Sequence, residues 1–268
     1  MPEVTLSVYG VEFSSYCEEL DLSGVPVDDA GAALEALLPQ MPHLRTVIMS
    51  DCGVSDEDMD ALNRRWENIR FLWTIYFGRC YYLRTDATSF IASLFEGKQS
   101  NYSDLSNEEV MKLRYCTDMV ALDLGHMSFT TCEFVRDMPH LRFFIVADTP
   151  VEDLSPLAGL EELWYLEIFG SKVTDISPLL DCPSLRHLNI SWCFPENGEL
   201  LLEMPHLERL WYMSPALTRE LYETLPQRLP DTELQLGMTG SAVGGTWRNH
   251  PAYYEMRDAF GAFYISPP

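Results

Sequence analysis

Two side chains with the chemistry of a catalytic pair stand 22 residues apart in the sequence. His126 and Asp148 hold the same position in neighbouring copies of the repeat described below, so we expect their side chains to lie close together. A carboxylate that holds an imidazole can orient it as a general base. No nucleophile is recognisably paired with them, and we therefore expect no catalytic role for this pair.

Other signatures of enzymes and metal sites are missing from the sequence. It contains no GxxxxGK, GxSxG or HExxH motif. Three of the six histidines belong to the tetrapeptide Met-Pro-His-Leu at 41–44, 138–141 and 204–207, in repeats that are not neighbours. The seven cysteines are an odd number, widely spaced and without a CxxC pair, which predicts buried free thiols. We predict a non-enzymatic protein with no metal and no cofactor.

An internal repeat determines where all these residues lie. Its clearest copies follow one another with an unbroken period of 22 and begin at Leu141, Leu163, Leu185 and Leu207. Within each copy, positions four and six are apolar, so they face one side of a strand while positions three and five face the other. Weaker copies begin at Cys17, Leu44, Leu72, Met119 and Asp231. The pattern predicts about nine strands.

This pattern resembles the leucine-rich repeat family over nearly the whole chain. The resemblance implies an α/β solenoid (a horseshoe) with a parallel sheet on its concave face, in which stacking buries what one repeat alone would expose. Asp-x-Ser-Pro-Leu at 153–157 and 175–179 is similar to the internalin-like subclass, whose convex side consists of short 3₁₀ turns. The earlier repeats are longer, and Ser55 suits the start of a convex helix. Segments at 73–77, 83–88, 122–126 and 247–258 are similar to a group of bacterial leucine-rich repeat proteins, which implies the fold and no activity.

We predict a single domain over 1–268. It comprises an N-terminal capping strand in 1–16, about nine repeats in 17–245 with a long insertion near 81–118, and a C-terminal cap in 246–268. The insertion is long enough for a degenerate repeat, which stays an open question. In the cap, Asn249-His250-Pro251 suits a helix start, with proline in the first turn. The column that is usually asparagine in the family contains Thr149, Ser171 and Cys193 here, so we expect a weak internal hydrogen-bond ladder.

The predicted concave face carries the functional signal. Its outward positions are aromatic and acidic where a solvent face would be polar, and exposed aromatic patches mark interfaces. The alternative is that some of these rings pack on one another or under a cap. The candidate ligand-binding residues are Asp123, Phe143, Tyr165, Glu167, Phe169, His187, Trp192, Arg209 and Trp211.

Charge restricts the class of partner. The net charge of −23 argues against nucleic acid and anionic membrane surfaces. We expect a monomer that binds a protein with apolar anchors and basic flanks, which would face Asp123 and Glu167. A carbohydrate-binding receptor is the alternative, and an enzyme is a third. No run of eighteen apolar residues and no signal peptide occurs, so we expect a cytoplasmic protein with no membrane insertion; a fragment of an exported or cell-surface protein is the alternative.

Overall fold

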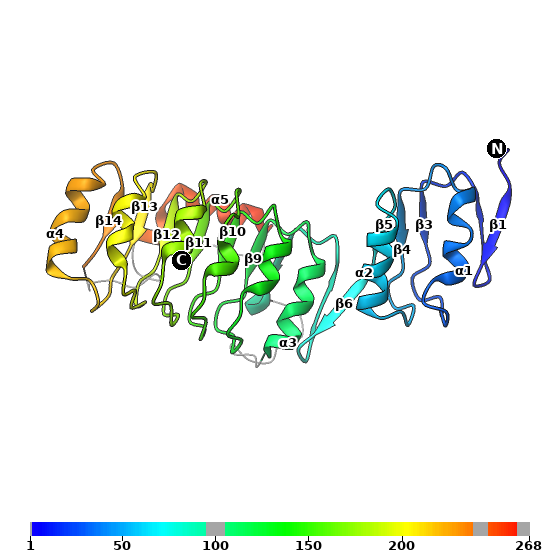
Figure 1. Ribbon diagram of the computed structural model, residues 1–268, viewed down its shortest axis with the longest axis horizontal. Helices are drawn as coiled ribbons and strands as arrows, with labels where there is room; N and C mark the ends of the chain where they lie inside the picture. The colour runs from blue at the N-terminus through cyan, green and yellow to red at the C-terminus, as the bar shows by residue number, and fades with distance from the viewer. Residues whose placement is uncertain (1, 95–104, 238–245, 262–268) are drawn as a thin grey trace. The chain divides into compact units, whose positions relative to one another are not determined.

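The computed structural model describes residues 2–94, 105–237 and 246–261 (Figure 1). The chain divides into two compact units. The first comprises residues 1–76 and 82–86, and the second comprises 77–81 and 87–268.

The first unit contains a hairpin and a small parallel sheet. Strands β1 (Thr5–Val8) and β2 (Val11–Ser14) pair antiparallel, and β3 (Glu19–Asp21), β4 (Thr46–Ile48) and β5 (Arg70–Leu72) pair in parallel. The segments between the parallel strands form α1 (Ala32–Glu35), the 3₁₀ helix η1 (Leu38–Gln40) and α2 (Asp56–Arg65). Helix α2 begins as predicted, because the Ser55 hydroxyl accepts a hydrogen bond of 3.1 Å from the Asp58 amide.

The repeat predicted to begin at Leu72 is displaced. Arg70 pairs with Thr46, so β5 begins four residues earlier than the predicted strand at Thr74. The predicted strand instead forms β6 (Thr74–Phe77), which pairs with β7 (Tyr81–Arg84). The error arose because the apolar run from Phe71 to Phe77 satisfies the leucine pattern in more than one register.

The second unit contains a seven-stranded parallel sheet in sequential order. Its strands are β8 (Ser89–Ile91), β9 (Ala121–Asp123), β10 (Phe143–Ile145), β11 (Tyr165–Glu167), β12 (His187–Asn189), β13 (Arg209–Trp211) and β14 (Glu233–Gln235). From β9 to β13, each residue pairs with the residue 22 positions later, as the sequence period predicts. Strand β8 pairs with β9, so the 81–118 segment contains the degenerate repeat left open above.

Short helices return the chain from each strand to the next. They are η2 (Ala92–Leu94), α3 (Asn107–Val110), η3 (Met111–Tyr115), η4 (Glu133–Asp137), η5 (Ser155–Leu157), η6 (Ser177–Asp181), η7 (Gly198–Glu203) and α4 (Arg219–Arg228). The Asp-x-Ser-Pro-Leu motifs form η5 and η6, as their sequence predicts. The Asp153 carboxylate accepts a hydrogen bond of 2.7 Å from the Ser155 amide, and proline then fixes the first turn.

The core of this unit lies between the sheet and the short helices. The central residues of β9–β13 point into it and are fully buried, namely Leu122, Phe144, Leu166, Leu188 and Leu210. In place of an asparagine ladder, short polar side chains bond the backbone there. The Thr149 hydroxyl donates to the Val146 carbonyl at 2.8 Å, and the Cys193 thiol donates to the Ile168 carbonyl at 3.0 Å.

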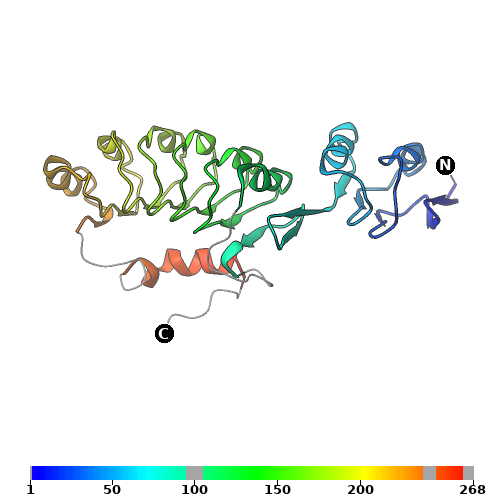
Figure 2. The same ribbon diagram turned by 90° about the horizontal axis from the view of Figure 1, so that it is seen from below.

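The C-terminal segment does not cap the end of the sheet. It forms η8 (Thr246–Asn249) and α5 (Pro251–Ala259), which lie along the face of the sheet opposite the short helices (Figure 2). Helix α5 starts as predicted, with Pro251 in its first turn and the His250 ring accepting a hydrogen bond of 3.0 Å from the Ala252 amide. Within the described residues, none of the helices has the length and apolar character needed to span a membrane.

Candidate functional site

The predicted binding face is covered by the chain itself. We name residues 246–260, which comprise η8 and α5, the strap. Its buried side chains enter a cluster formed by the concave side of β8–β11 and β13, so this face is part of a second apolar core. The cluster contains Ile91, Ala121, Phe143, Ile145, Tyr165, Trp211, Met213, Trp247, Tyr253, Met256 and Phe260.

Hydrogen bonds and charges also hold the strap. The Glu167 carboxylate accepts a hydrogen bond from the Tyr165 hydroxyl and one of 2.8 Å from the Trp247 indole. The Arg209 guanidinium donates to the Trp247 carbonyl at 3.0 Å and lies 4.1 Å from the centre of its ring. At the other end, Arg142 pairs with Glu255. Trp247 of the strap therefore contacts two buried charged side chains of the sheet, Glu167 and Arg209.

Burial shifts the ionisation of these groups. Desolvation raises the pKa of the Glu167 carboxyl, although the hydrogen bonds from Tyr165 and Trp247 oppose the shift. Desolvation also lowers the pKa of Arg209. The pKa of His187 falls to about 3 because of burial and the neighbouring Arg209 charge. His187 is therefore neutral at neutral pH.

Four neighbouring side chains on β12 and β13 are buried but keep polar atoms to which neither the strap nor the sheet provides a hydrogen bond. His187 pairs across the strands with Arg209, and Asn189 pairs with Trp211, so the four form a two-by-two block on the concave side. All are at most 2 % exposed. Within the described part of the chain, both His187 ring nitrogens, Asn189 Nδ2, Arg209 Nε and Nη1, and Trp211 Nε1 have no hydrogen-bond partner. Unpaired buried groups of this kind lower stability.

The structure places the nine predicted site residues in three environments. Asp123, Phe143, Tyr165, Glu167, His187, Arg209 and Trp211 are buried. Phe169 is half-buried, and Trp192 is 42 % exposed. The expectation that the seven buried side chains form an open surface is wrong, because the strap packs on this face. The sequence signal for the strap was Trp247 and the apolar spacing of 253, 256 and 260, which we had assigned to an end cap.

A row of residues with left-handed backbone follows the sheet and remains open. His126, Asp148, Gly170 and Trp192 lie three residues after the ends of β9, β10, β11 and β12, with φ values of 64°, 53°, 70° and 60°. We name this row the ridge. The amide of each ridge residue donates to a carbonyl of the next repeat, as in Trp192 to Met213 at 3.0 Å. The stacking of the repeats thus imposes the left-handed conformation, which glycine adopts freely and tryptophan does not.

His126 and Asp148 lie as close together as the catalytic-pair hypothesis requires, but nothing else at this position suits catalysis. His126 Nδ1 lies 2.9 Å from Asp148 Oδ2, as the spacing predicts, but both side chains are about half exposed. Among the described residues, no group of three or more histidine, cysteine, aspartate or glutamate side chains could hold a metal ion. An exposed pair on the ridge has no pocket wall to exclude water from a reaction.

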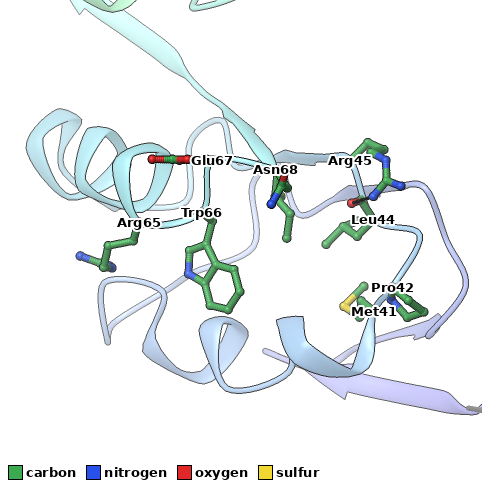
Figure 3. Close-up of a pocket in the computed structure, with 9 residues that line it drawn as sticks. Met41, Pro42, Leu44, Arg45, Arg65, Trp66, Glu67 and Asn68 are labelled. Carbon is green, nitrogen blue, oxygen red and sulfur yellow. Dashed lines mark hydrogen bonds between the residues drawn. The ribbon is translucent and has the colours of Figure 1, made fainter.

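A cavity in the first unit does not supply a site either. It has a volume of 310 Å³ and lies beside Leu44, Arg45 and Trp66 (Figure 3). Two of its polar lining groups already have partners, because Arg65 and the Trp66 indole both donate to Glu35 at 2.8–2.9 Å.

All seven cysteines are free thiols in the structure. Five are buried, whereas Cys17 and Cys80 are partly exposed. The expectation of burial is therefore correct for five cysteines and wrong for Cys17 and Cys80. Cys80 lies in the turn between β6 and β7 rather than after a strand of the main sheet.

Comparison with known proteins agrees with this architecture. Residues 40–62 match the family model described as "Leucine Rich repeat". No curated protein sequence is significantly similar to the chain.

Several bacterial leucine-rich repeat structures resemble the fold. Internalin C2 from Listeria monocytogenes has a TM-score of 0.44 and 17% identity over 57% of this chain and 64% of its own. A leucine-rich repeat protein from Leptospira interrogans has a TM-score of 0.48 and 15% identity over 82% and 54%. The functional domain of InlJ from Listeria monocytogenes, described as including a cysteine ladder, has a TM-score of 0.41 and 12% identity over 85% and 56%. The chain thus spans less than two thirds of each of these proteins.

Three features identify the leucine-rich repeat fold: the parallel strands with a 22-residue register, the Asp-x-Ser-Pro-Leu 3₁₀ turns, and the matched repeat. The chain therefore has the leucine-rich repeat fold, and residues 40–62 match the family model of that repeat.

Proposed function

We propose that this protein is a non-enzymatic protein-binding module whose binding surface is the ridge, with Trp192 as its main anchor. The observation that carries the proposal is the combination of exposure and backbone conformation at Trp192. A bulky residue in the left-handed region costs about 1–2 kcal/mol, and Gly170 shows that the preceding repeat accepts glycine at the same place. Strain of this kind is concentrated at functional sites.

The surroundings of Trp192 suit recognition of a protein. Phe194 is 50 % exposed two residues later, and Phe169 is half-buried in the preceding repeat. Tryptophan is enriched among the residues that dominate interface energies, since its ring supplies a large contact area at low entropic cost. The net charge of −23 favours a partner with basic flanks. The seven covered residues of the concave face do not touch a partner while the strap is in place.

The test compares two exposed aromatic residues. Wild-type protein, Trp192→Gly and Tyr222→Ala would each be immobilised and exposed to extract and cell-surface proteins of the native host. Tyr222 is 50 % exposed on α4 and lies off the ridge. We expect Trp192→Gly to weaken binding of the captured partner at least about tenfold and Tyr222→Ala to leave it unchanged.

Two results would contradict the proposal. If wild type and Trp192→Gly bind the partner with equal affinity, the ridge is not the binding surface. Binding that free sugars abolish, with no protein captured, would favour the carbohydrate-binding alternative at the same indole.

A further inference from the structure

A second cavity lies in the other unit, between η7 and α4. It has a volume of 340 Å³. Its apolar lining residues include Leu202 and Leu221, and its polar lining residues include three glutamates, Glu196, Glu199 and Glu220. No residue of the ridge or of the strap lines it.

The Tyr212 side chain ends in this cavity. Tyr212 is only 1 % exposed, yet it belongs to the cavity lining. Gly198, on the opposite wall, leaves room for the hydroxyl, because a Cβ atom at position 198 would lie 3.2 Å from Tyr212 Oη. Within the described residues this hydroxyl has no hydrogen-bond partner, although tyrosine hydroxyls usually find one when buried. Burial raises its pKa to about 12, so it stays protonated.

The charge of the cavity is unbalanced. No lysine, arginine or histidine lines it. Among the ion pairs of the described residues, none involves Glu196, Glu199 or Glu220; the nearest base in sequence, Arg219, pairs instead with Glu223 at 2.8 Å. The negative charge of Glu199 adds to the effect of burial in raising the pKa of the Tyr212 hydroxyl. The cavity thus offers acceptors without a cation.

We propose that this cavity binds a cationic group carried on an unbranched aliphatic stem. The leucine wall accommodates the stem, the carboxylates neutralise the charge, and the Tyr212 oxygen accepts a hydrogen bond from the ammonium. Two sources share this chemistry, namely a free alkylamine and the side chain of a lysine in a partner. The site is separate from the ridge, so its test does not depend on the proposed function.

The experiment is a titration of the whole ¹⁵N-labelled chain, monitored by the backbone amide signals of Thr218 and Leu221 at the cavity. The probes are pentylamine, N-acetyl-lysine methylamide and the uncharged N-acetyl-norleucine methylamide. We expect both amines to shift these signals with saturation, and the norleucine derivative to bind at least about fivefold more weakly, because it cannot form charged hydrogen bonds to the carboxylates. The tighter of the two amines identifies the source.

Variants test each wall separately. Tyr212→Phe and Glu199→Gln should each weaken amine binding, and Glu203→Gln, on the same helix but outside the cavity, should not. Gly198→Ala provides a second approach if Tyr212→Phe fails to fold, since its Cβ would crowd the hydroxyl and the Gly198 backbone is not left-handed. Equal binding of the norleucine derivative, or amine binding that none of these variants weakens, would overturn the proposal, as would the absence of any shift.

Discussion

The strap makes a sharp prediction about two tryptophans on neighbouring repeats. Trp211 is 2 % exposed, with its ring centre 5.4 Å from that of Trp247, whereas Trp192 is 42 % exposed. Trp211→Ala removes a buried indole that has no hydrogen bond to lose, so the cost is the lost apolar burial plus a cavity. Truncation of a buried tryptophan to alanine costs about 3–5 kcal/mol. We expect the melting temperature to fall by roughly 10 °C.

The control variant is Trp192→Gly, measured by circular dichroism during thermal and urea unfolding. It relieves strain of about 1–2 kcal/mol and is opposed by the greater freedom of glycine in the unfolded chain. We therefore expect wild-type stability or slightly more. If Trp211→Ala melts with the wild type, the strap does not cover the concave face in solution and the seven residues beneath it become candidates for partner binding again.

Two further predictions concern protonation and thiols. The unfolded chain protonates His187 near pH 6.5 and the folded chain only near pH 3, so the unfolded state holds the extra proton between these values and stability falls as the pH is lowered through this range. His187→Phe should remove this contribution, which amounts to at most about 1.4 kcal/mol per pH unit, and urea unfolding from pH 7 to pH 4 would detect it; parallel curves for the two proteins would refute the assignment. Thiol titration should find seven reactive groups in denaturant, but in the native protein only Cys17 and Cys80 should react quickly, because the other five are buried. Fast reaction of Cys132 or Cys182, whose pKa values burial raises, would contradict the packing of the core.

The repeats could be predicted from the sequence because every repeat has to bury the same set of apolar positions against its neighbours. Leucines at fixed spacing must face a common core, and Asp153 and Asp175 each cap their own turn through bonds two residues away. Such contacts depend on nearest neighbours and therefore leave a periodic pattern. The prediction of a strand after Leu72 was wrong because this pattern is ambiguous there: a continuous apolar run fits the leucine spacing in more than one register. The degenerate repeat at β8 was hidden because Phe90 and Ile91 are almost all that remains of its pattern.

The strap could not be predicted because its contacts are not periodic. Glu167 meets Trp247 across 80 residues and Arg142 meets Glu255 across 113. An aromatic position that faces outward from a strand has the same sequence pattern whether a partner, solvent or the chain's own helix covers it. What distinguishes these cases is a second apolar segment of matching size elsewhere in the chain, and the segment from Trp247 to Phe260 is that counterpart. A row of outward aromatic residues in a repeat protein is therefore evidence for an external ligand only after the apolar segments outside the repeats have been assigned a place.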